Sequence, residues 1–133
     1  MERRHILVID DEADIREVAG ISLEAIGGWR VSTAGGGQEG IAKAVAERPD
    51  AILCDVMMPD IDGPATFARL QENPDTAGIP VVLLTARVQH ADRVGFAQLG
   101  VAGVLSKPFD PMELSDRVDA LLAPLAAGAS EKQ

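Results

Sequence analysis

Short apolar runs alternate along the chain with longer segments whose apolar residues recur at helical spacing. Five of these runs are rich in strand-forming residues, and they lie at 6–9, 29–33, 51–54, 79–84 and 101–105. Four are almost continuously apolar, which is typical of strands buried on both faces of a parallel sheet. The run at 29–33 is more mixed in polarity, so we place that strand at an edge of the sheet.

The segments between the runs predict five helices. We expect them over about 15–26, 41–48, 64–70 and 88–99, and in a last segment that opens with 110–113. Gly27, Pro49 and Gly100 follow three of these patterns and are typical helix terminators. Strands that are each followed by a helix predict an α/β fold, here a doubly wound five-stranded parallel sheet with helices on both faces.

Polar side chains follow four of the five apolar runs. They are Asp10 and Asp11 after the first run, Asp55 after the third, Thr85 after the fourth, and Ser106 and Lys107 after the fifth. Ligands of open α/β sheets bind outside the carboxyl ends of the strands. If the strand order is 2-1-3-4-5, these side chains converge on one pocket.

Three carboxylates in one pocket repel one another and resist burial unless they are neutralised. A hard divalent cation resolves both problems, and Mg²⁺ suits one or two carboxylates together with waters and a phosphate. A nearby lysine and hydroxyl fit the remaining oxygens of a phosphoryl group. A carboxylate can also act as a nucleophile and form an aspartyl phosphate. The pattern therefore indicates a site for Mg²⁺ and a phosphoryl group.

Composition narrows the classes of protein that remain. The 133 residues suffice for one domain with a single core, and 12 basic against 21 acidic residues give a net charge of −9. An acidic domain repels nucleic acid and anionic lipid, so we expect neither as a direct partner. No signal peptide or membrane span is visible, and Cys54 is the only cysteine, so a reducing cytoplasm is the simplest location.

Four motifs together resemble the receiver domain of two-component response regulators. They are VIDD at 8–11, DVMMPDIDG at 55–63, LTA at 84–86 and KPF at 107–109, and their order and strand-end positions match that family. The resemblance implies a flavodoxin-like fold with the strand order 2-1-3-4-5. It covers residues 4–124, which we take as the receiver domain, and we take 125–133 as a flexible C-terminal tail or the start of a linker.

The resemblance implies a phosphorylation switch that depends on Mg²⁺. Asp55 would accept a phosphoryl group from a histidine kinase or a histidine phosphotransfer protein. Asp11 and Asp55 would bind Mg²⁺ directly, together with the backbone carbonyl of Met57. Asp10 would act mainly through a metal-bound water.

The resemblance also assigns the groups that contact the phosphoryl oxygens. Lys107 would pair with them, and Thr85 would move to form a hydrogen bond with the phosphoryl group. Receivers commonly have a cis peptide bond after this lysine, so we expect one between Lys107 and Pro108. Phosphorylation adds about −1.5 to −2 charges and three strong acceptors, which would draw these groups together.

A receiver is a signalling module rather than a turnover enzyme, although it promotes its own aspartyl phosphorylation and dephosphorylation. The chain would act by binding a downstream protein target or by relaying the phosphoryl group. The alternative is that the chain is a receiver excised from a longer regulator, so that its output domain is absent. The apolar tail is consistent with this alternative. The resemblance also allows a homodimer through the fourth helix, the fifth strand and the fifth helix.

Four positions depart from the usual receiver pattern or set its behaviour. Val104 stands three residues before the lysine, where many receivers carry Tyr or Phe, so we expect output through the loop after Thr85 or through the fourth helix instead. Met57 and Arg87 flank the phosphoryl site, and a bulky apolar Met57 predicts a long-lived phosphoryl state. Gly95 weakens the predicted fourth helix by about 1 kcal/mol relative to alanine.

Two other classes of protein share part of this sequence pattern. Phosphatases of the haloacid-dehalogenase type also use a strand-end aspartate and Mg²⁺, but they need an Asp-x-Asp spacing that Asp10, Asp11 and Glu12 lack. Residues 35–40 match the dinucleotide pattern G-x-G-x-x-G, although they follow the second, edge-like strand. Neither alternative explains the four strand-end motifs together.

Overall fold

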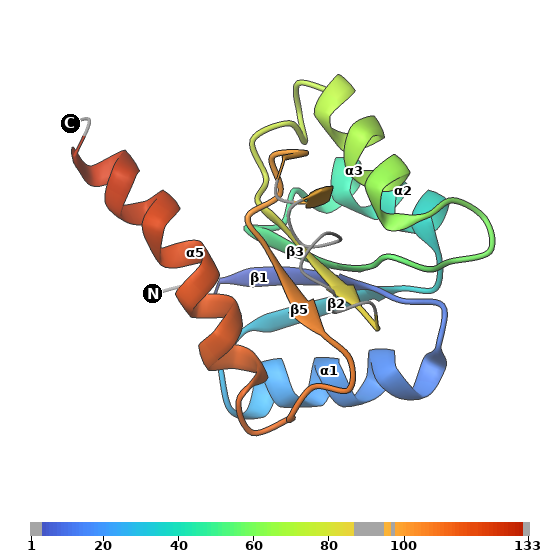
Figure 1. The fold of residues 1–133 in the computed structure, drawn as a ribbon, viewed down its shortest axis with the longest axis vertical. Coiled ribbons are helices and arrows are strands. Elements are labelled where there is room, and N and C mark those ends of the chain that lie inside the picture. The colour runs from blue at the N-terminus through green and yellow to red at the C-terminus, as the bar shows by residue number, and fades with distance from the viewer. Residues whose placement is uncertain (1–3, 87–94, 97, 132–133) are drawn as a thin grey trace.

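The computed structural model describes residues 4–86, 95–96 and 98–131. Its elements in chain order are β1 (His5–Ile9), α1 (Ala13–Ala25), β2 (Arg30–Ala34), α2 (Gly37–Glu47), β3 (Ala51–Asp55), α3 (Gly63–Glu72), β4 (Val81–Thr85), β5 (Gly103–Ser106) and α5 (Leu114–Glu131). The helix predicted over 88–99 falls mostly outside the described residues, so no α4 is labelled in Figure 1.

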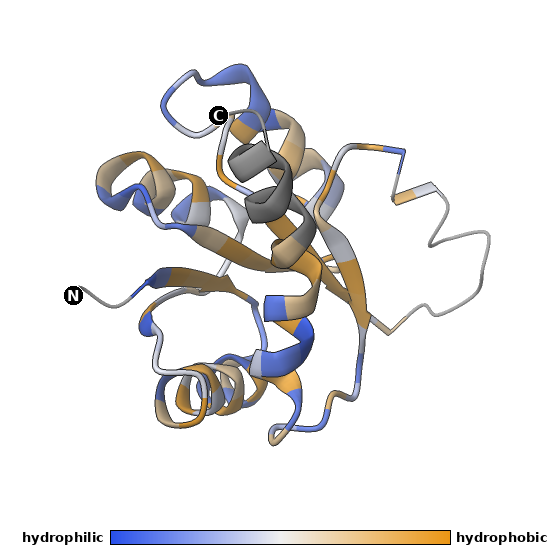
Figure 2. Ribbon diagram, turned by 90° about the vertical axis from the view of Figure 1, so that its left-hand side faces the viewer, coloured by the Kyte–Doolittle hydropathy of each residue, from blue (hydrophilic) through white to orange (hydrophobic). Residues whose placement is uncertain are grey.

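The five strands form one sheet in the order β2-β1-β3-β4-β5, and all neighbouring strands are parallel. This confirms the predicted doubly wound arrangement, including the edge position of β2. Of the four strands predicted to be buried on both faces, β1, β3 and β4 are buried at every residue. That prediction was wrong for β5, which lies at the other edge of the sheet and is fully buried only at Leu105. Figure 2 shows the same strands as largely hydrophobic segments in the middle of the molecule.

Successive residues of a strand point to opposite faces of the sheet, so alternate residues pack into two separate hydrophobic cores, one on each face. On one face, Ile6, Val8 and Leu53 pack with residues of α1 and α5. On the other face, Ile52 and Leu83 pack with residues of α2 and α3. Figure 1 shows the two pairs of helices on opposite sides of the sheet. The sheet is thus covered on both faces by the described helices, which leave its ends accessible to ligands.

Four strands end one residue later than the apolar runs predicted, and in β3, β4 and β5 the added residue is polar. Asp55, Thr85 and Ser106 are the last residues of β3, β4 and β5 rather than the first residues beyond them. Backbone pairing continues through these polar positions, since Asp55 pairs with Leu84 and Thr85 with Ser106. The ladder depends on main-chain groups and not on side-chain polarity. The site residues are therefore fixed by the sheet itself.

The last helix begins later than its sequence pattern predicted. The segment 110–113 was expected to open it, but α5 starts at Leu114. The Asp110 side chain accepts a hydrogen bond from the Met112 amide at 2.9 Å, and its carbonyl accepts one from the Leu114 amide at 3.0 Å. These bonds close a turn over 110–113 ahead of the helix. An aspartate whose side chain accepts from the amide two residues on can cap a helix or close a turn, and here the turn precedes the helix.

The backbone of α5 continues to Glu131, and its C-terminal part projects away from the sheet in Figure 1. The sequence predicted that the domain ends at about residue 124, and that boundary stays a prediction. None of the helices among the described residues combines the length and the apolar character that a bilayer crossing requires.

The end of the sheet where β1 begins is closed by the single tryptophan. Trp29 is 1% exposed and lies in the core that faces α1 and α5. The Arg4 guanidinium lies over its ring, 3.9 Å from the ring centre. Arg4 also pairs with Asp119 of α5 at 2.8 Å. This cation–π contact and ion pair connect the start of β1 with α5.

Candidate functional site

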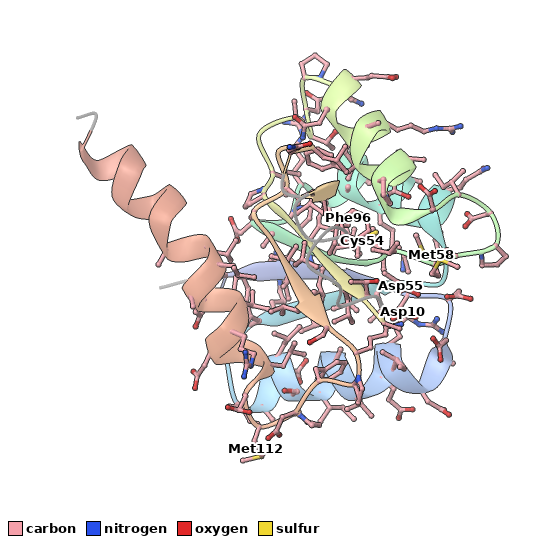
Figure 3. All side chains as sticks on the ribbon, in the orientation of Figure 1. Asp10, Cys54, Asp55, Met58, Phe96 and Met112 are labelled. Atoms are coloured by element: carbon pink, nitrogen blue, oxygen red, sulfur yellow. The ribbon has the colours of Figure 1, made fainter. Side chains whose placement is uncertain are left out.

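The carboxyl end of the sheet brings four of the predicted site residues together. Asp55 and Thr85 are the last residues of β3 and β4, while Asp10 and Lys107 directly follow β1 and β5. The paired strands carry these residues to one edge of the sheet because they run parallel and in register. Figure 3 shows Asp10 and Asp55 side by side at this edge.

The Lys107 ammonium lies among three carboxylates. Its Nζ is 3.1 Å from Asp10 Oδ2, 3.2 Å from Asp55 Oδ1 and 3.3 Å from Glu12 Oε1. The side chain of Lys107 is 10% exposed, and Asp10 and Asp55 are almost fully buried. The peptide bond between Lys107 and Pro108 is cis, as predicted. One buried cation therefore faces two buried anions and a third at the surface.

The charges in this pocket shift the pKa values of Asp55 and Lys107. Burial, followed by the neighbouring Asp10 carboxylate, raises the pKa of Asp55 to about 6, although Lys107 opposes the shift. Burial lowers the pKa of Lys107, but its contacts with Asp10 and Asp55 outweigh that effect and raise it. Lys107 therefore keeps its positive charge. The buried carboxylates of Asp10 and Asp55 together carry more negative charge than Lys107 alone neutralises.

One oxygen of Asp55 has no hydrogen-bond partner. Asp55 Oδ2 is buried, and no donor among the described residues reaches it. Asp10 Oδ2 likewise lacks hydrogen-bond geometry, although it makes the ion pair with Lys107. A buried carboxylate oxygen without a partner is rare and calls for a cation or water. This orphaned oxygen is the strongest single mark of a ligand site in the described part of the chain.

Four carboxylates could surround a metal ion at this position. Asp10, Asp11, Glu12 and Asp55 each offer one oxygen, and these oxygens lie within 4.8 Å of one another. Asp11 and Glu12 are exposed, so the site is open to solvent on one side. An all-oxygen donor set with an open side fits a hard divalent cation that keeps some of its waters. The residues present therefore fit the predicted Mg²⁺.

The loop after β3 is held close to Asp55. The Met57 amide lies 3.4 Å from Asp55 Oδ1, while the Met57 side chain is 61% exposed. The Gly63 amide donates to the Val56 carbonyl at 2.8 Å. A Cβ at Gly63 would lie 2.7 Å from the Asp55 carbonyl oxygen, so no larger residue fits there without a backbone shift. Glycine at this position allows α3 to start directly against the loop.

The same loop also binds the start of α2. The Asp60 carboxylate accepts hydrogen bonds from the amides of Gly37 at 3.1 Å and Gln38 at 3.0 Å. Backbone N–H groups, led by that of Gln38, lower the pKa of Asp60. The first amides of α2 are therefore already occupied by a carboxylate. This weighs against the dinucleotide interpretation of residues 35–40, which needs those amides for a pyrophosphate.

Two residues of the site were missed in the sequence. Glu12 contacts Lys107, and Arg16 of α1 donates from Nη1 to the Asp10 carbonyl at 2.7 Å. Glu12 continues a visible run of three acids, and Arg16 lies one helical turn further on. The acidic run was a signal that could have been used for Glu12. Nothing in the local pattern indicates the contact of Arg16.

Several other predicted positions have clear locations. Thr85 is 1% exposed at the pocket, and half-buried Val104 packs on the core that faces α2 and α3. Cys54 is buried, and burial followed by the Asp55 charge raises its pKa strongly, so it is an unreactive core thiol. Among the described atoms none lies within 4 Å of a Cβ placed on Gly95. Arg87 lies outside the described residues.

Comparisons with known proteins agree with this geometry. The family model described as response regulator receiver domain matches residues 6–119. The chain is 42% identical over 117 residues to the DNA-binding dual master transcriptional regulator RpaA of Synechocystis, covering 88% of this chain and 48% of that protein. It is 38% identical over 130 residues to the alkaline phosphatase synthesis transcriptional regulatory protein PhoP of Bacillus subtilis, covering 96% and 53%.

Among solved structures, the chemotaxis protein CheY4 of Vibrio cholerae matches with a TM-score of 0.84 at 29% identity, covering 91% of this chain and all of that one. The chain spans about half the length of the curated relatives named above. Their names describe transcriptional regulators, one of them DNA-binding, which differs from the prediction that nucleic acid is not a direct partner. Because only about half of each relative is matched, that prediction for these residues remains untested.

Proposed function

This chain belongs to the response regulator receiver domain family of two-component signalling, and from that premise we propose that Asp55 is its phosphoryl acceptor. The observation that carries the proposal is the buried, unpartnered Oδ2 of Asp55 beside Asp10 and Lys107. A carboxylate oxygen that is already free of hydrogen bonds keeps its lone pairs available for attack. The donor would be a phosphohistidine on a histidine kinase or a phosphotransfer protein.

The metal in this proposal is Mg²⁺. Asp11 and Asp55 would hold it directly with the Met57 carbonyl, and Asp10 would hold it through water. When bound, the ion supplies positive charge for the phosphoryl oxygens and for the crowded carboxylates. The close approach of the carboxylate oxygens of Asp10, Asp11 and Asp55 supports this assignment.

The transfer forms one bond and breaks one. Asp55 Oδ2 attacks the phosphorus, and the bond from phosphorus to the donor imidazole nitrogen breaks, with its electron pair going to that nitrogen. The product is an acyl phosphate on Asp55. Lys107, whose pKa is raised by its carboxylate neighbours, stays charged and binds a phosphoryl oxygen. Thr85, which is buried at the end of β4, would move toward another phosphoryl oxygen.

The chain would signal by a change in the segment that follows Thr85. Val104 has a branched side chain without a ring, so a rotating aromatic side chain is not part of this switch. We therefore place the output in the loop after Thr85 or in the helix predicted over 88–99. The readers would be a downstream protein target or an attached output domain, and a homodimer is a further form to test. The cytoplasmic location stays a prediction.

The test is intact mass after incubation with acetyl phosphate. We expect a gain of one phosphoryl group that requires Mg²⁺ and that disappears in Asp55→Ala. Asp75→Ala, which removes an exposed carboxylate paired with Arg48, serves as the matched control and should gain the group like the wild type. A gain that persists in Asp55→Ala would overturn the assignment. Slow loss of the group, over minutes or longer, would support the long-lived state predicted from Met57.

A further inference from the structure

Carboxylates already surround the Lys107 ammonium, where a phosphoryl group would bind. An ammonium has three N–H donors and no acceptor. Three carboxylates, those of Asp10, Asp55 and Glu12, lie within 3.3 Å of Nζ. Asp10 makes an ion pair without hydrogen-bond geometry, whereas Glu12 Oε1 accepts a hydrogen bond from Nζ. A phosphoryl oxygen on Asp55 therefore competes with these carboxylates for Lys107.

Exposure decides which contact is released. Asp10 and Asp55 have side chains that are 1% and 3% exposed, so neither can exchange Lys107 for bulk water. The Glu12 side chain is 59% exposed and is hydrated as soon as it turns outward. Releasing a buried ion pair leaves an uncompensated charge, whereas an exposed pair contributes little and separates easily. Glu12 is the partner that can leave.

Among the described residues, no interaction other than that with Lys107 holds the Glu12 side chain in place. Glu12 is the residue before α1, but its carboxylate caps no amide of that helix. Its backbone amide donates to Asp10 Oδ1 at 2.9 Å, which fixes the main chain beside the pocket. The side chain thus starts from an anchored position and reaches only Lys107 among the described residues.

We propose that Glu12 is a positioning residue that holds Lys107 while Asp55 is unmodified and competes with the phosphoryl group for it. This inference rests on the proposed function of Asp55. Its consequence is that Glu12 has two opposite effects on the site. Its negative charge favours Mg²⁺, because its carboxylate lies with those of the metal cluster. Its hold on Lys107 disfavours the phosphorylated state.

The experiment measures two dissociation constants by calorimetric titration, one for Mg²⁺ alone and one for beryllofluoride, a phosphoryl analogue, at saturating Mg²⁺. Glu12→Ala removes charge and contact, and it should raise the Kd for Mg²⁺ and lower that for beryllofluoride, each by about 2- to 5-fold. Glu12→Asp keeps the charge but is too short for the contact. It should leave the Mg²⁺ Kd unchanged and lower the beryllofluoride Kd as Glu12→Ala does.

Glu17→Gln is the matched control, since it removes the charge of an exposed glutamate elsewhere on α1. It should change neither constant by as much as 2-fold. If Glu12→Asp behaves like the wild type toward beryllofluoride, the contact with Lys107 has no role and the proposal is wrong. An unchanged or raised beryllofluoride Kd in Glu12→Ala overturns it as well. If the wild type itself binds no beryllofluoride, or if Asp55→Asn still binds it, the proposed function of Asp55 fails instead.

Discussion

The two ends of the sheet carry buried polar clusters of opposite character. At the end where the strands begin, His5 is 5% exposed, and its Nε2 lies 2.7 Å from Ser32 Oγ. Ser32 donates to Glu47 at 2.6 Å, and Asp50 accepts from the His5 amide at 2.8 Å. Only the Nδ1 of His5 lacks a partner in this cluster. Its groups satisfy one another and close a network that stabilises the sheet.

At the other end of the sheet, carboxylates outnumber the positively charged groups among the described residues. Three carboxylates share the ammonium of Lys107, the Asp11 carboxylate lies close to them, and a buried oxygen of Asp55 has no donor within the described part of the chain. A structural cluster would have been satisfied within the protein, as the His5 cluster nearly is. The difference shows that burial of polar groups does not itself mark a functional site. What marks it is negative charge that the protein leaves uncompensated.

Among the variants that test this difference between the two ends, removal of Lys107 should change the unfolding free energy most. Lys107→Ala leaves Asp10 and Asp55 buried without a cation, so we expect the metal-free protein to lose about 3 kcal/mol of unfolding free energy at pH 8. Mg²⁺ should stabilise the variant more than the wild type, because it replaces the lost charge. Urea unfolding with EDTA or with Mg²⁺ measures both effects.

Lys43→Ala is the control for that experiment. Lys43 makes a surface pair with Glu39 and donates to the Thr33 carbonyl at the edge of the sheet, and its loss should cost less than about 2 kcal/mol. Equal stability of Lys107→Ala and the wild type without metal would show that the pocket is already neutralised by water or by protonation.

The second prediction concerns pH and Asp55. Its pKa is raised from 3.8 to about 6 in the folded chain. Between these values the folded state binds more protons than the unfolded state, so the contribution of Asp55 to stability decreases as pH rises, and the decrease is complete above about pH 6. We expect metal-free wild type to lose about 2 kcal/mol relative to Asp55→Asn between pH 4 and pH 7.

The measurement for Asp55 is the difference in unfolding free energy between the two proteins at each pH, which cancels the other titrating groups. A difference that stays constant across this range would contradict the raised pKa. A difference that grows in the opposite direction would mean that Lys107 dominates over burial and Asp10.

The smallest effect should come from the opposite end of the sheet. Glu47→Ala removes a half-exposed partner of Ser32 and His5, so we expect a loss of less than about 1 kcal/mol in unfolding free energy. The Kd for Mg²⁺ and the gain of a phosphoryl group from acetyl phosphate should be unchanged. A change in either would show that the two ends of the sheet are coupled.

The sequence was informative where the fold imposes long apolar runs. Strands buried on both faces must be continuously apolar, so β1, β3 and β4 and the polar residues at their ends could be predicted. The cis bond at Pro108 and the edge position of β2 were also confirmed. The roles assigned to Asp55, Lys107 and the metal ligands remain predictions.

The features that were missed depend on contacts between distant segments. Arg16 reaches the Asp10 carbonyl, and Asp60 binds amides 22 and 23 residues earlier in the chain. Neither contact has a periodic signature. The start of α5 was misplaced because Asp110 binds an amide within its own turn, and the same residue type can cap a helix or close a turn.

The buried tryptophan described with the fold gives the chain an internal optical reporter. Trp29 lies next to the beginning of β1, whereas Asp10 follows its end, so the full length of that strand separates the indole from the acidic pocket. Its emission should shift to longer wavelength when the chain unfolds and water reaches the ring. Ion binding at the far end of the strand should leave it almost unchanged. Every stability measurement above can therefore be read from one native fluorophore, with no label to disturb the pocket.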